Sequence, residues 1–375
     1  DCNVPTLRFP NYNGEWQKTV MGKVCSFRKG YGIAKDDLSR GGTPCILYGE
    51  LYTTYKTAIA KTIKSKTSIQ SKSLVYSQKD DVIIPCSGET AEDIATSICV
   101  PYDGVLLGGD LTIVHSDLDG AFLSNQINSV RKFDIARIAQ GKSIVHLQAD
   151  ELKKIFIFYP SIQEQRKISA FIDKIDERIE IQNKIISKYE TLIKGLCDMI
   201  FPSIEGSILP LKAIVSIEKG QQINGMSLAK TGKYYYLNGG IAPSGYIDDY
   251  NTSEETISIS EGGNSCGFVS YNIQKFWSGG HCYTLKIMAE QCRSKYLFFY
   301  LKYKEKDIMQ LRVGSGLPNI QKKSLENFNV KLPNYKKQCF VERVFEVVTA
   351  KKEIENALLE RFQSQKKFLL SKMFI

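Results

Sequence analysis

The chain has 375 residues, of which 43% are hydrophobic and 11% aromatic, and its formal net charge is +10. This composition excludes a disordered chain, and the length allows two domains of ordinary size. The sequence contains no apolar run of about 18 residues and no basic segment followed by an apolar stretch at its start, so we expect no membrane span and no signal peptide.

The cysteine content and the net charge indicate the cellular compartment and the type of partner. Ten cysteines are scattered from Cys2 to Cys339 without a C-x-x-C pair, and the chain has only three histidines. This spacing does not fit a zinc knuckle, and we expect reduced, mostly buried thiols in a cytoplasmic protein. The 50 Lys and Arg residues exceed the 40 Asp and Glu residues, which suggests a polyanionic partner.

The first part of the chain, residues 1–159, is predicted to be a β-rich domain. Short strands separated by Gly, Asp and Ser turns are expected at residues 22–27, 44–47, 74–76, 81–85, 95–100 and 111–114. A helix over residues 120–138 and a strand over 155–158 complete this part.

A long helix over residues 163–200 follows and carries a heptad stripe. Its apolar seam residues are Ile168, Ile172, Ile175, Ile179, Ile186, Tyr189, Ile193 and Leu196. Such a stripe is typical of a coiled coil and needs a partner helix, although an isolated run would equally fit ordinary core packing. The comparable stretch is residues 338–375, with the seam residues Val341, Phe345, Val348, Leu359, Phe362 and Leu369. Lys352, Glu355 and Lys366 occupy seam positions of this second helix, so its pattern is degenerate.

The sequence contains an internal repeat, in which one unit occurs twice. Pro160, Gln165 and Phe201 fall on Pro333, Gln338 and Phe374 at a constant spacing of 173 residues (333 − 160). Strands are predicted at residues 212–217, 234–237, 256–260, 267–270, 283–287 and 329–332, with a helix over 294–311. In the front halves, Lys29-Gly30 falls on Lys219-Gly220 at a spacing of 190 (219 − 29), so the first copy carries extra residues, which we place within 56–79.

Several runs carry a family resemblance. Residues 158–168 (FYPSIQEQRKI), 172–179 (IDKIDERI) and 195–202 (GLCDMIFP) resemble the central repeat of the specificity subunits of type I restriction–modification systems. The opening residues 4–10 (VPTLRFP) and 14–16 (GEW) are similar to the start of many such subunits, and residues 369–374 repeat the helix exit. The resemblance covers the whole chain.

This resemblance implies an α+β fold with a pseudo-two-fold internal repeat. Two similar β-rich target-recognition domains, residues 1–159 and 203–332, are separated by two long antiparallel helices, residues 160–202 and 333–375, that form a coiled coil. Each domain is expected to read one half of a bipartite DNA site. A helix of about 38 residues is roughly 57 Å long, enough to hold two domains on half-sites one DNA turn apart.

The resemblance also implies partners and cofactors. The expected partners are double-stranded DNA and two methyltransferase subunits, with or without restriction subunits, and no membrane. The chain itself is expected to bind no cofactor, because S-adenosylmethionine belongs to the methyltransferase subunits, and ATP and Mg to a restriction subunit.

DNA reading needs cations for phosphates and amide or guanidinium groups for base edges. Around the repeated Lys-Gly pairs, the candidates are Arg28, Lys29, Tyr31, Lys35 and Arg40 in the first copy and Lys219, Gln221, Gln222, Asn224 and Lys230 in the second. Later loops add Arg137, Gln140, Lys142, Ser143 and His146 in the first copy and Arg312, Ser315 and Asn319 in the second. Each of these residues alone equally fits a solvated loop side chain.

Catalytic signatures are missing from the sequence. We find neither a methyltransferase motif of the Asn-Pro-Pro-Tyr type nor a nuclease centre, and we expect no metal site, because His115, His146 and His281 are isolated. The leading hypothesis is a non-catalytic DNA-recognition subunit. A self-sufficient methyltransferase or nuclease fused to such readers, and a coiled-coil adaptor that binds only protein, remain as alternatives.

Overall fold

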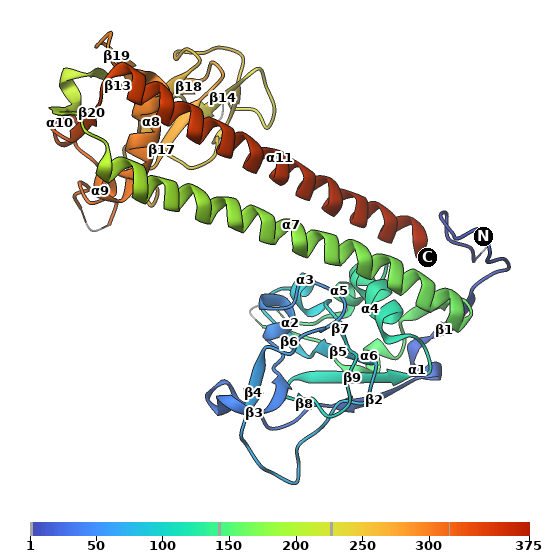
Figure 1. The fold of residues 1–375 in the computed structure, drawn as a ribbon. Coiled ribbons are helices and arrows are strands. Elements are labelled where there is room, and N and C mark those ends of the chain that lie inside the picture. The colour runs from blue at the N-terminus through green and yellow to red at the C-terminus, as the bar shows by residue number, and fades with distance from the viewer. Residues whose placement is uncertain (1–2, 142–143, 226–227, 315) are drawn as a thin grey trace. The chain divides into compact units, whose positions relative to one another are not determined.

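The structure is a computed structural model that describes residues 3–141, 144–225, 228–314 and 316–375. The chain divides into two compact units: residues 1–183 with 357–375, and residues 184–356. Each unit contains one globular part and a segment of both long helices, α7 (Ile162–Ser203) and α11 (Tyr335–Met373) (Figure 1).

The globular part of the first unit combines short helices with three small sheets and a central four-stranded sheet. The central sheet has the strand order β2-β9-β5-β7, and a three-stranded sheet has the order β4-β3-β8. Two-stranded pairs join β1 to β11 and β6 to β10. The elements are β1 (Gln17–Val20), α1 (Met21–Val24), β2 (Cys25–Lys29), β3 (Leu38–Ile46), α2 (Glu50–Thr53), β4 (Ser65–Thr67), β5 (Asp81–Pro85), β6 (Ser87–Gly88), α3 (Ala91–Ile94), β7 (Ile98–Val100), β8 (Leu106–Leu107), β9 (Leu111–Ser116), α4 (Gly120–Asn128), α5 (Lys132–Ile138), β10 (Val145–His146), α6 (Ala149–Leu152) and β11 (Phe156–Tyr159).

The second unit repeats this topology. Its central sheet has the order β13-β19-β16-β17, its three-stranded sheet has the order β15-β14-β18, and β12 pairs with β20. The elements are β12 (Ser207–Pro210), β13 (Val215–Lys219), β14 (Tyr234–Leu237), β15 (Gly245–Ile247), β16 (Thr256–Ser260), β17 (Val269–Asn272), β18 (Trp277–Ser278), β19 (Cys282–Ile287), α8 (Ser294–Tyr303), α9 (Glu305–Met309), α10 (Lys322–Glu326) and β20 (Asn329–Leu332). The predicted α+β fold with an internal repeat is confirmed.

The strand registers follow the spacings seen in the sequence. Gln17 pairs with Tyr159 in the first unit, and Ser207 pairs with Leu332 in the second. The difference in length between the copies lies between the three-stranded and central sheets, where residues 47–80 of the first copy correspond to residues 238–255 of the second. The expected 56–79 region falls inside this segment.

Several predicted elements are corrected by the structure. Residues 21–24 form a helical turn before β2, because Gly22 packs against Lys153 and donates its amide to that residue's carbonyl. No strand covers 74–76, where Tyr76 makes an isolated bridge to Leu106. The helix expected over 120–138 breaks at Ser129, whose hydroxyl bonds the carbonyl of Asn125 (2.6 Å) and competes with the backbone.

The second predicted helix, over residues 294–311, also divides in two. Lys304 separates α8 from α9, and its dihedral angles (φ −88°, ψ 10°) depart from the helical values. The end of α7 differs as well. Pro202 lies inside the last turn of that helix, which continues to Ser203.

The first globular part is built in three layers. Successive residues of a strand face opposite sides of a sheet. Val82 and Val114 therefore share a core with Leu123 and Ile127 of α4, whereas Ile83 and Ile113 lie in a separate core with Ile46 and Leu107 of the three-stranded sheet. The central sheet is thus covered by helices on one face and by the small sheet on the other.

A buried glutamine joins each globular part to a long helix. Gln165 of α7 donates to the carbonyl of Pro160 (2.8 Å) and accepts the amide of Asp119, the N-cap residue of α4 (2.9 Å). Gln338 of α11 donates to the carbonyl of Pro333 (2.9 Å) and accepts the amide of Arg293, the N-cap residue of α8 (2.9 Å). The same attachment is therefore made in both units.

The long helices run antiparallel in each unit. In the first unit Asp176 contacts Lys366, and Arg178 lies over the ring of Phe362. In the second unit Glu190 contacts Lys352, and Phe201 stacks on Phe345 with ring centroids 5.5 Å apart. Residue numbers rise along one helix as they fall along the other, which is the antiparallel arrangement that the family resemblance implied.

The predicted seam residues line this contact. Those packed beneath a globular part are buried: Ile168, Ile172, Ile175, Val341, Phe345 and Leu369. The others are half-buried: Ile179, Ile186, Tyr189, Ile193, Leu196, Val348, Leu359 and Phe362. Of these, Ile179, Ile193 and Leu196 also pack against the core of a globular part. Lys352 and Lys366, which make the second repeat degenerate, form ion pairs across the seam with Glu190 (3.0 Å) and Asp176 (2.5 Å).

Two further findings concern the cysteines and the long helices. Each of the nine described cysteines is a free thiol, and five of them are buried. Burial raises the pKa of the Cys45 and Cys25 thiols to about 11, so both stay protonated at neutral pH. Within the described ranges, no helix is both long enough and apolar enough to cross a membrane.

The packing of the seam residues leads to a first prediction, which concerns the free energy of unfolding. Ile172 is fully buried among Phe158, Leu369 and Phe374, and Ile172→Ala should lower the free energy of unfolding by about 2–5 kcal/mol. Ile181 on the same helix is 56% exposed, and Ile181→Ala should change it by less than about 0.5 kcal/mol. Urea denaturation followed by circular dichroism measures both; equal losses would contradict the packing described.

Candidate nucleic-acid interface

Loops from distant parts of the sequence meet at one end of each central sheet, which we call the loop end. In the first unit, the amide of Cys86 bonds the carbonyl of Asp110 (2.7 Å), and the amide of Leu147 bonds the carbonyl of Cys86 (2.9 Å). In the second unit, the amide of Glu261 bonds the carbonyl of His281 (2.8 Å), and the amide of Ile320 bonds the carbonyl of Glu261 (2.8 Å). The two loop ends share one backbone framework.

The repeated glycine after β2 and β13 is required by this framework. A Cβ on Gly30 would lie 2.0 Å from the carbonyl oxygen of Gly108, and a Cβ on Gly220 would lie 2.3 Å from that of Gly279. Only glycine permits such a close approach of two backbones. The Lys-Gly pair noticed in the sequence therefore marks the point where the candidate loop leaves the sheet.

The first unit brings part of the predicted set to its loop end. Lys29 is the last residue of β2, Tyr31 and Lys35 follow it, and His146 lies in β10, which pairs with β6. Arg40 lies instead on β3 and Arg137 on α5, while Gln140 bridges to His146. These side chains are exposed: Lys29, Tyr31, Lys35, Arg40, Arg137, Gln140 and His146. Lys142 and Ser143 lie outside the described residues.

The second unit gathers its predicted residues more closely. Lys219 ends β13, and Gln221, Gln222 and Asn224 follow in the next loop, with Lys230 further along it. Gln222 packs against Gly280, and Asn319 bridges to both Gly262 and Val313. The exposed side chains are Lys219, Gln221, Gln222, Asn224, Lys230, Arg312 and Asn319. Ser315 lies outside the described residues.

The predicted cations divide into two groups by their partners. Arg28 pairs with Asp81 (2.7 Å) and Lys219 pairs with Glu261 (2.6 Å), so a carboxylate neutralises each of them. Within the described ranges, the other cations of the set make no ion pair: Lys29, Lys35, Arg40, Arg137, Lys230 and Arg312. The second group has its charge available for phosphates.

Glu261 organises the polar side chains of the second loop end. Its Oε1 accepts from Lys219 and from the hydroxyl of Tyr283 (3.0 Å), and its Oε2 is buried without a hydrogen-bond partner among the described atoms. The imidazole Nδ1 of His281 lies 3.6 Å from that oxygen. Burial, and then the charge of Glu261, raise the pKa of the Tyr283 phenol, which stays a hydrogen-bond donor.

Asp81 and Glu261 are not among the residues predicted from the sequence, and two of the histidines predicted to be isolated lie beside them. His115 bonds Asp81 (2.8 Å), and His281 lies beside Glu261. The partners are separated along the chain and no local motif links them, although Asp81 opens a strand that was predicted correctly. In the part of the chain that is described, no three His, Cys, Asp or Glu side chains group as metal ligands would.

A family profile matches both halves of the chain. The type I restriction modification DNA specificity domain aligns with residues 13–191 and again with residues 208–363. The chain belongs to this specificity family. The two matches correspond to the two copies of the repeat, so the resemblance noted in the sequence is confirmed.

A comparison with individual curated proteins also finds members of this family. The chain is 33% identical over 123 residues to a type I specificity subunit from Mycoplasma pneumoniae, a match that spans 32% of this chain and 32% of that protein. The matched stretch is thus about a third of the curated relative.

Solved structures show the fold of the whole chain. The S subunit of a type I restriction-modification system from M. genitalium superposes with a TM-score of 0.72 at 19% identity, over 99% of each chain. A chain from a structure titled for complex assembly and conformational transition of the type I R-M system gives a TM-score of 0.57 at 16% identity, over 96% of this chain and 97% of that one. At these identities the likeness concerns the fold alone.

The loop end of this specificity-family chain yields a second prediction. Gly220→Ala should cost about 1–3 kcal/mol and displace the loop that carries Gln221 and Gln222, because the new methyl group meets the backbone of Gly279. Gly225→Ala, in the same loop, meets no heavy atom within 4 Å and serves as the control. Unfolding midpoints and amide exchange of residues 220–225 measure the difference. Equal behaviour of the two variants would contradict the close approach.

Proposed function

We propose that this chain is the DNA-recognition subunit of a type I restriction–modification complex. In this proposal residues 1–159 and 203–332 are target-recognition domains that each read one half of a bipartite site, and the helices, residues 160–202 and 333–375, set the spacing between the halves. The observation that carries it is the loop end, built twice on one backbone framework but lined by different side chains. Two readers of two different sequences need that combination.

The partners in this proposal supply the chemistry. Two methyltransferase subunits bind the chain and methylate adenine in each half-site with S-adenosylmethionine, and restriction subunits that use ATP and Mg join in systems that cleave. The chain itself is non-catalytic and acts in the cytoplasm on double-stranded DNA. Membership of the specificity family supports this assignment of roles.

Mapping methylated adenines tests the proposal directly. The full chain is expressed with its methyltransferase subunits in a host that lacks other adenine methylation, and the genome is sequenced for modified bases. We expect one bipartite motif with a fixed spacer, present only when the chain is present. Methyl transfer by the purified chain alone would instead show a self-sufficient enzyme, and a complex that methylates without sequence preference would overturn the proposal.

Exchanging one domain separates the two readers. Replacing residues 22–159 with the corresponding block of another specificity subunit should change one half of the methylated motif and leave the other half and the spacer unchanged. The reason is that the second unit keeps its own sheet and loop end. A change in both halves would contradict independent reading.

The unpaired cations should account for the dependence of binding on salt. Each phosphate contact contributes about 0.9 to the slope of log K against log salt concentration. Lys29→Gln should therefore flatten this slope by about 0.9 and weaken binding to all sequences alike. Lys188→Gln, which removes an exposed lysine from α7, is the matched control and should leave the slope unchanged. Fluorescence anisotropy at several salt concentrations measures the slopes; identical slopes for both variants would place Lys29 away from DNA.

A further inference from the structure

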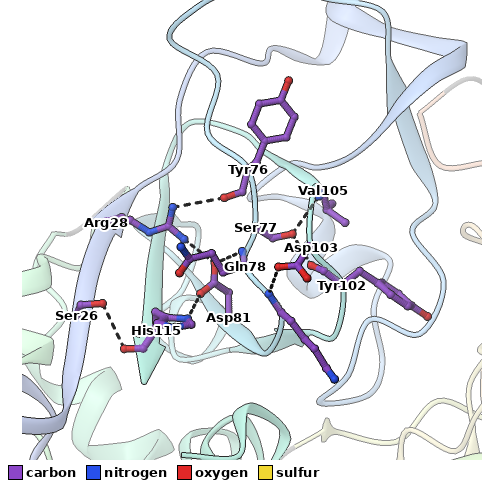
Figure 2. A network of polar contacts seen from close by, with 11 residues as sticks. Ser26, Arg28, Tyr76, Ser77, Gln78, Asp81, Tyr102, Asp103, Val105 and His115 are labelled. Carbon is purple, nitrogen blue, oxygen red and sulfur yellow. Dashed lines mark hydrogen bonds and ion pairs between the residues drawn. The ribbon is translucent and has the colours of Figure 1, made fainter. Parts of the chain in front are cut away.

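In the first unit, a buried carboxylate holds an arginine and a histidine side by side. Asp81 is fully buried, and its Oδ2 accepts from the guanidinium of Arg28 (2.7 Å) and from the amide of Gln78 (2.8 Å). Its Oδ1 contacts Nδ1 of His115 (2.8 Å). Figure 2 shows the two side chains converging on this carboxylate from strands β2 and β9.

The fixed carboxylate determines what the two side chains offer to a ligand. Arg28 is 37% exposed and His115 is 38% exposed, whereas Asp81 is inaccessible. A carboxylate accepts, so Nδ1 of His115 donates to it, and in the tautomer that this bond selects Nε2 is the acceptor. Arg28 keeps further N–H donors, since the carboxylate takes one amino group and the carbonyl of Tyr76 lies at 3.4 Å. The exposed face thus presents donors beside an acceptor.

The fold does not require this trio. In the strand register of the second unit, Arg28, Asp81 and His115 correspond to Glu218, Thr256 and Lys286. The same four-stranded sheet forms there without a buried acid at that place. Burying a carboxylate costs several kcal/mol before its partners compensate, so a purely structural role would be better served by the arrangement of the second copy, where the charged residues Glu218 and Lys286 are exposed.

The charge of the trio favours a base edge over a phosphate. Phosphate contacts draw on net positive charge, but Asp81 already compensates Arg28, whereas the adjacent Lys29 has no such partner within the described ranges. Base edges instead require donors and acceptors held in a fixed direction. In the major groove a G·C pair presents the acceptors N7 and O6 of guanine beside the amino donor N4 of cytosine.

We propose that Arg28 and His115, positioned by Asp81, read one G·C base pair in the half-site of the first unit. Arg28 donates to N7 and O6 of guanine, and Nε2 of His115 accepts from N4 of cytosine. Asp81 is a positioning residue that does not touch DNA. The trio lies at the start of β5 and near the end of β9, which is the end of the central sheet opposite the loop end. This inference rests on the proposed function and adds to the loop end a second contact surface by which one domain discriminates.

The test uses the full chain in its methyltransferase complex and compares methylated motifs. His115→Ala keeps the Arg28–Asp81 ion pair, and the double variant Arg28→Gln with Asp81→Asn removes both charges together, so neither leaves a buried charge unpaired. We expect each to relax one G·C position of one half-site, lowering the preference for that pair by about tenfold to a hundredfold. The other half-site, the spacer and the salt slope stay unchanged.

Lys29→Gln is the matched control, because it alters the neighbouring residue of the same strand and should weaken binding at every sequence. A double variant that flattens the salt slope while keeping the motif intact would show that Arg28 contacts phosphate and would overturn the inference. An unchanged motif and unchanged slope would overturn it as well, by showing that the trio lies away from DNA. If the wild-type complex has no bipartite motif, the proposed function fails first, so the two failures are distinguishable.

Discussion

The attachment of each globular part to its long helix depends on one buried glutamine. Gln165 and Gln338 sit near the start of α7 and α11 and are almost completely inaccessible. Each side-chain amide donates to a proline carbonyl and accepts the backbone amide at the N-cap of the next helix. A buried amide left without partners would cost about 1–3 kcal/mol, so both bonds must form together. This fixes the direction in which each globular part leaves its helix.

Around this shared attachment the two copies have diverged. Beside Gln165, Ser169 donates to Asp119, whose carboxylate caps α4. At the matching place beside Gln338, Glu342 caps α8 by accepting from the amide of Tyr296 and pairs with Arg293. A carboxylate therefore caps the next helix in both units. In the first unit it belongs to Asp119, the residue that precedes the capped helix, and in the second it belongs to Glu342 of the long helix α11. The loop ends diverge in the same manner, since a common backbone carries different side chains.

Features that repeat along the sequence could be predicted from it, whereas contacts between residues far apart in the chain could not. The heptads of α7, the strands β5, β14, β16 and β20 and the two spacings could be predicted because each follows from local periodicity or from matching residues at a fixed distance. The pairing of Asp81 with Arg28 and His115 could not, because 53 and 34 residues separate these partners along the chain. The break at Ser129 was missed because a side-chain hydroxyl decides it. Long-range polar contacts have no periodic signature, and they distinguish one reader from the other.

Two polar trios illustrate how such contacts diversify a common sheet. Arg28, Asp81 and His115 lie on or beside β2, β5 and β9, and Lys219, Glu261 and His281 lie on or beside the equivalent β13, β16 and β19. The carboxylate is at the start of the strand in the first unit and beyond its end in the second. The same chemistry therefore sits at opposite ends of corresponding strands.

The central claim is that one chain carries two separate DNA readers. Hydroxyl-radical footprinting of the assembled complex on its methylated motif tests it most directly. The account predicts two protected segments separated by an unprotected spacer, with protection of only the first segment altered by substitutions in residues 22–159. A single continuous protected segment, or protection that changes as a whole with either unit, would contradict it.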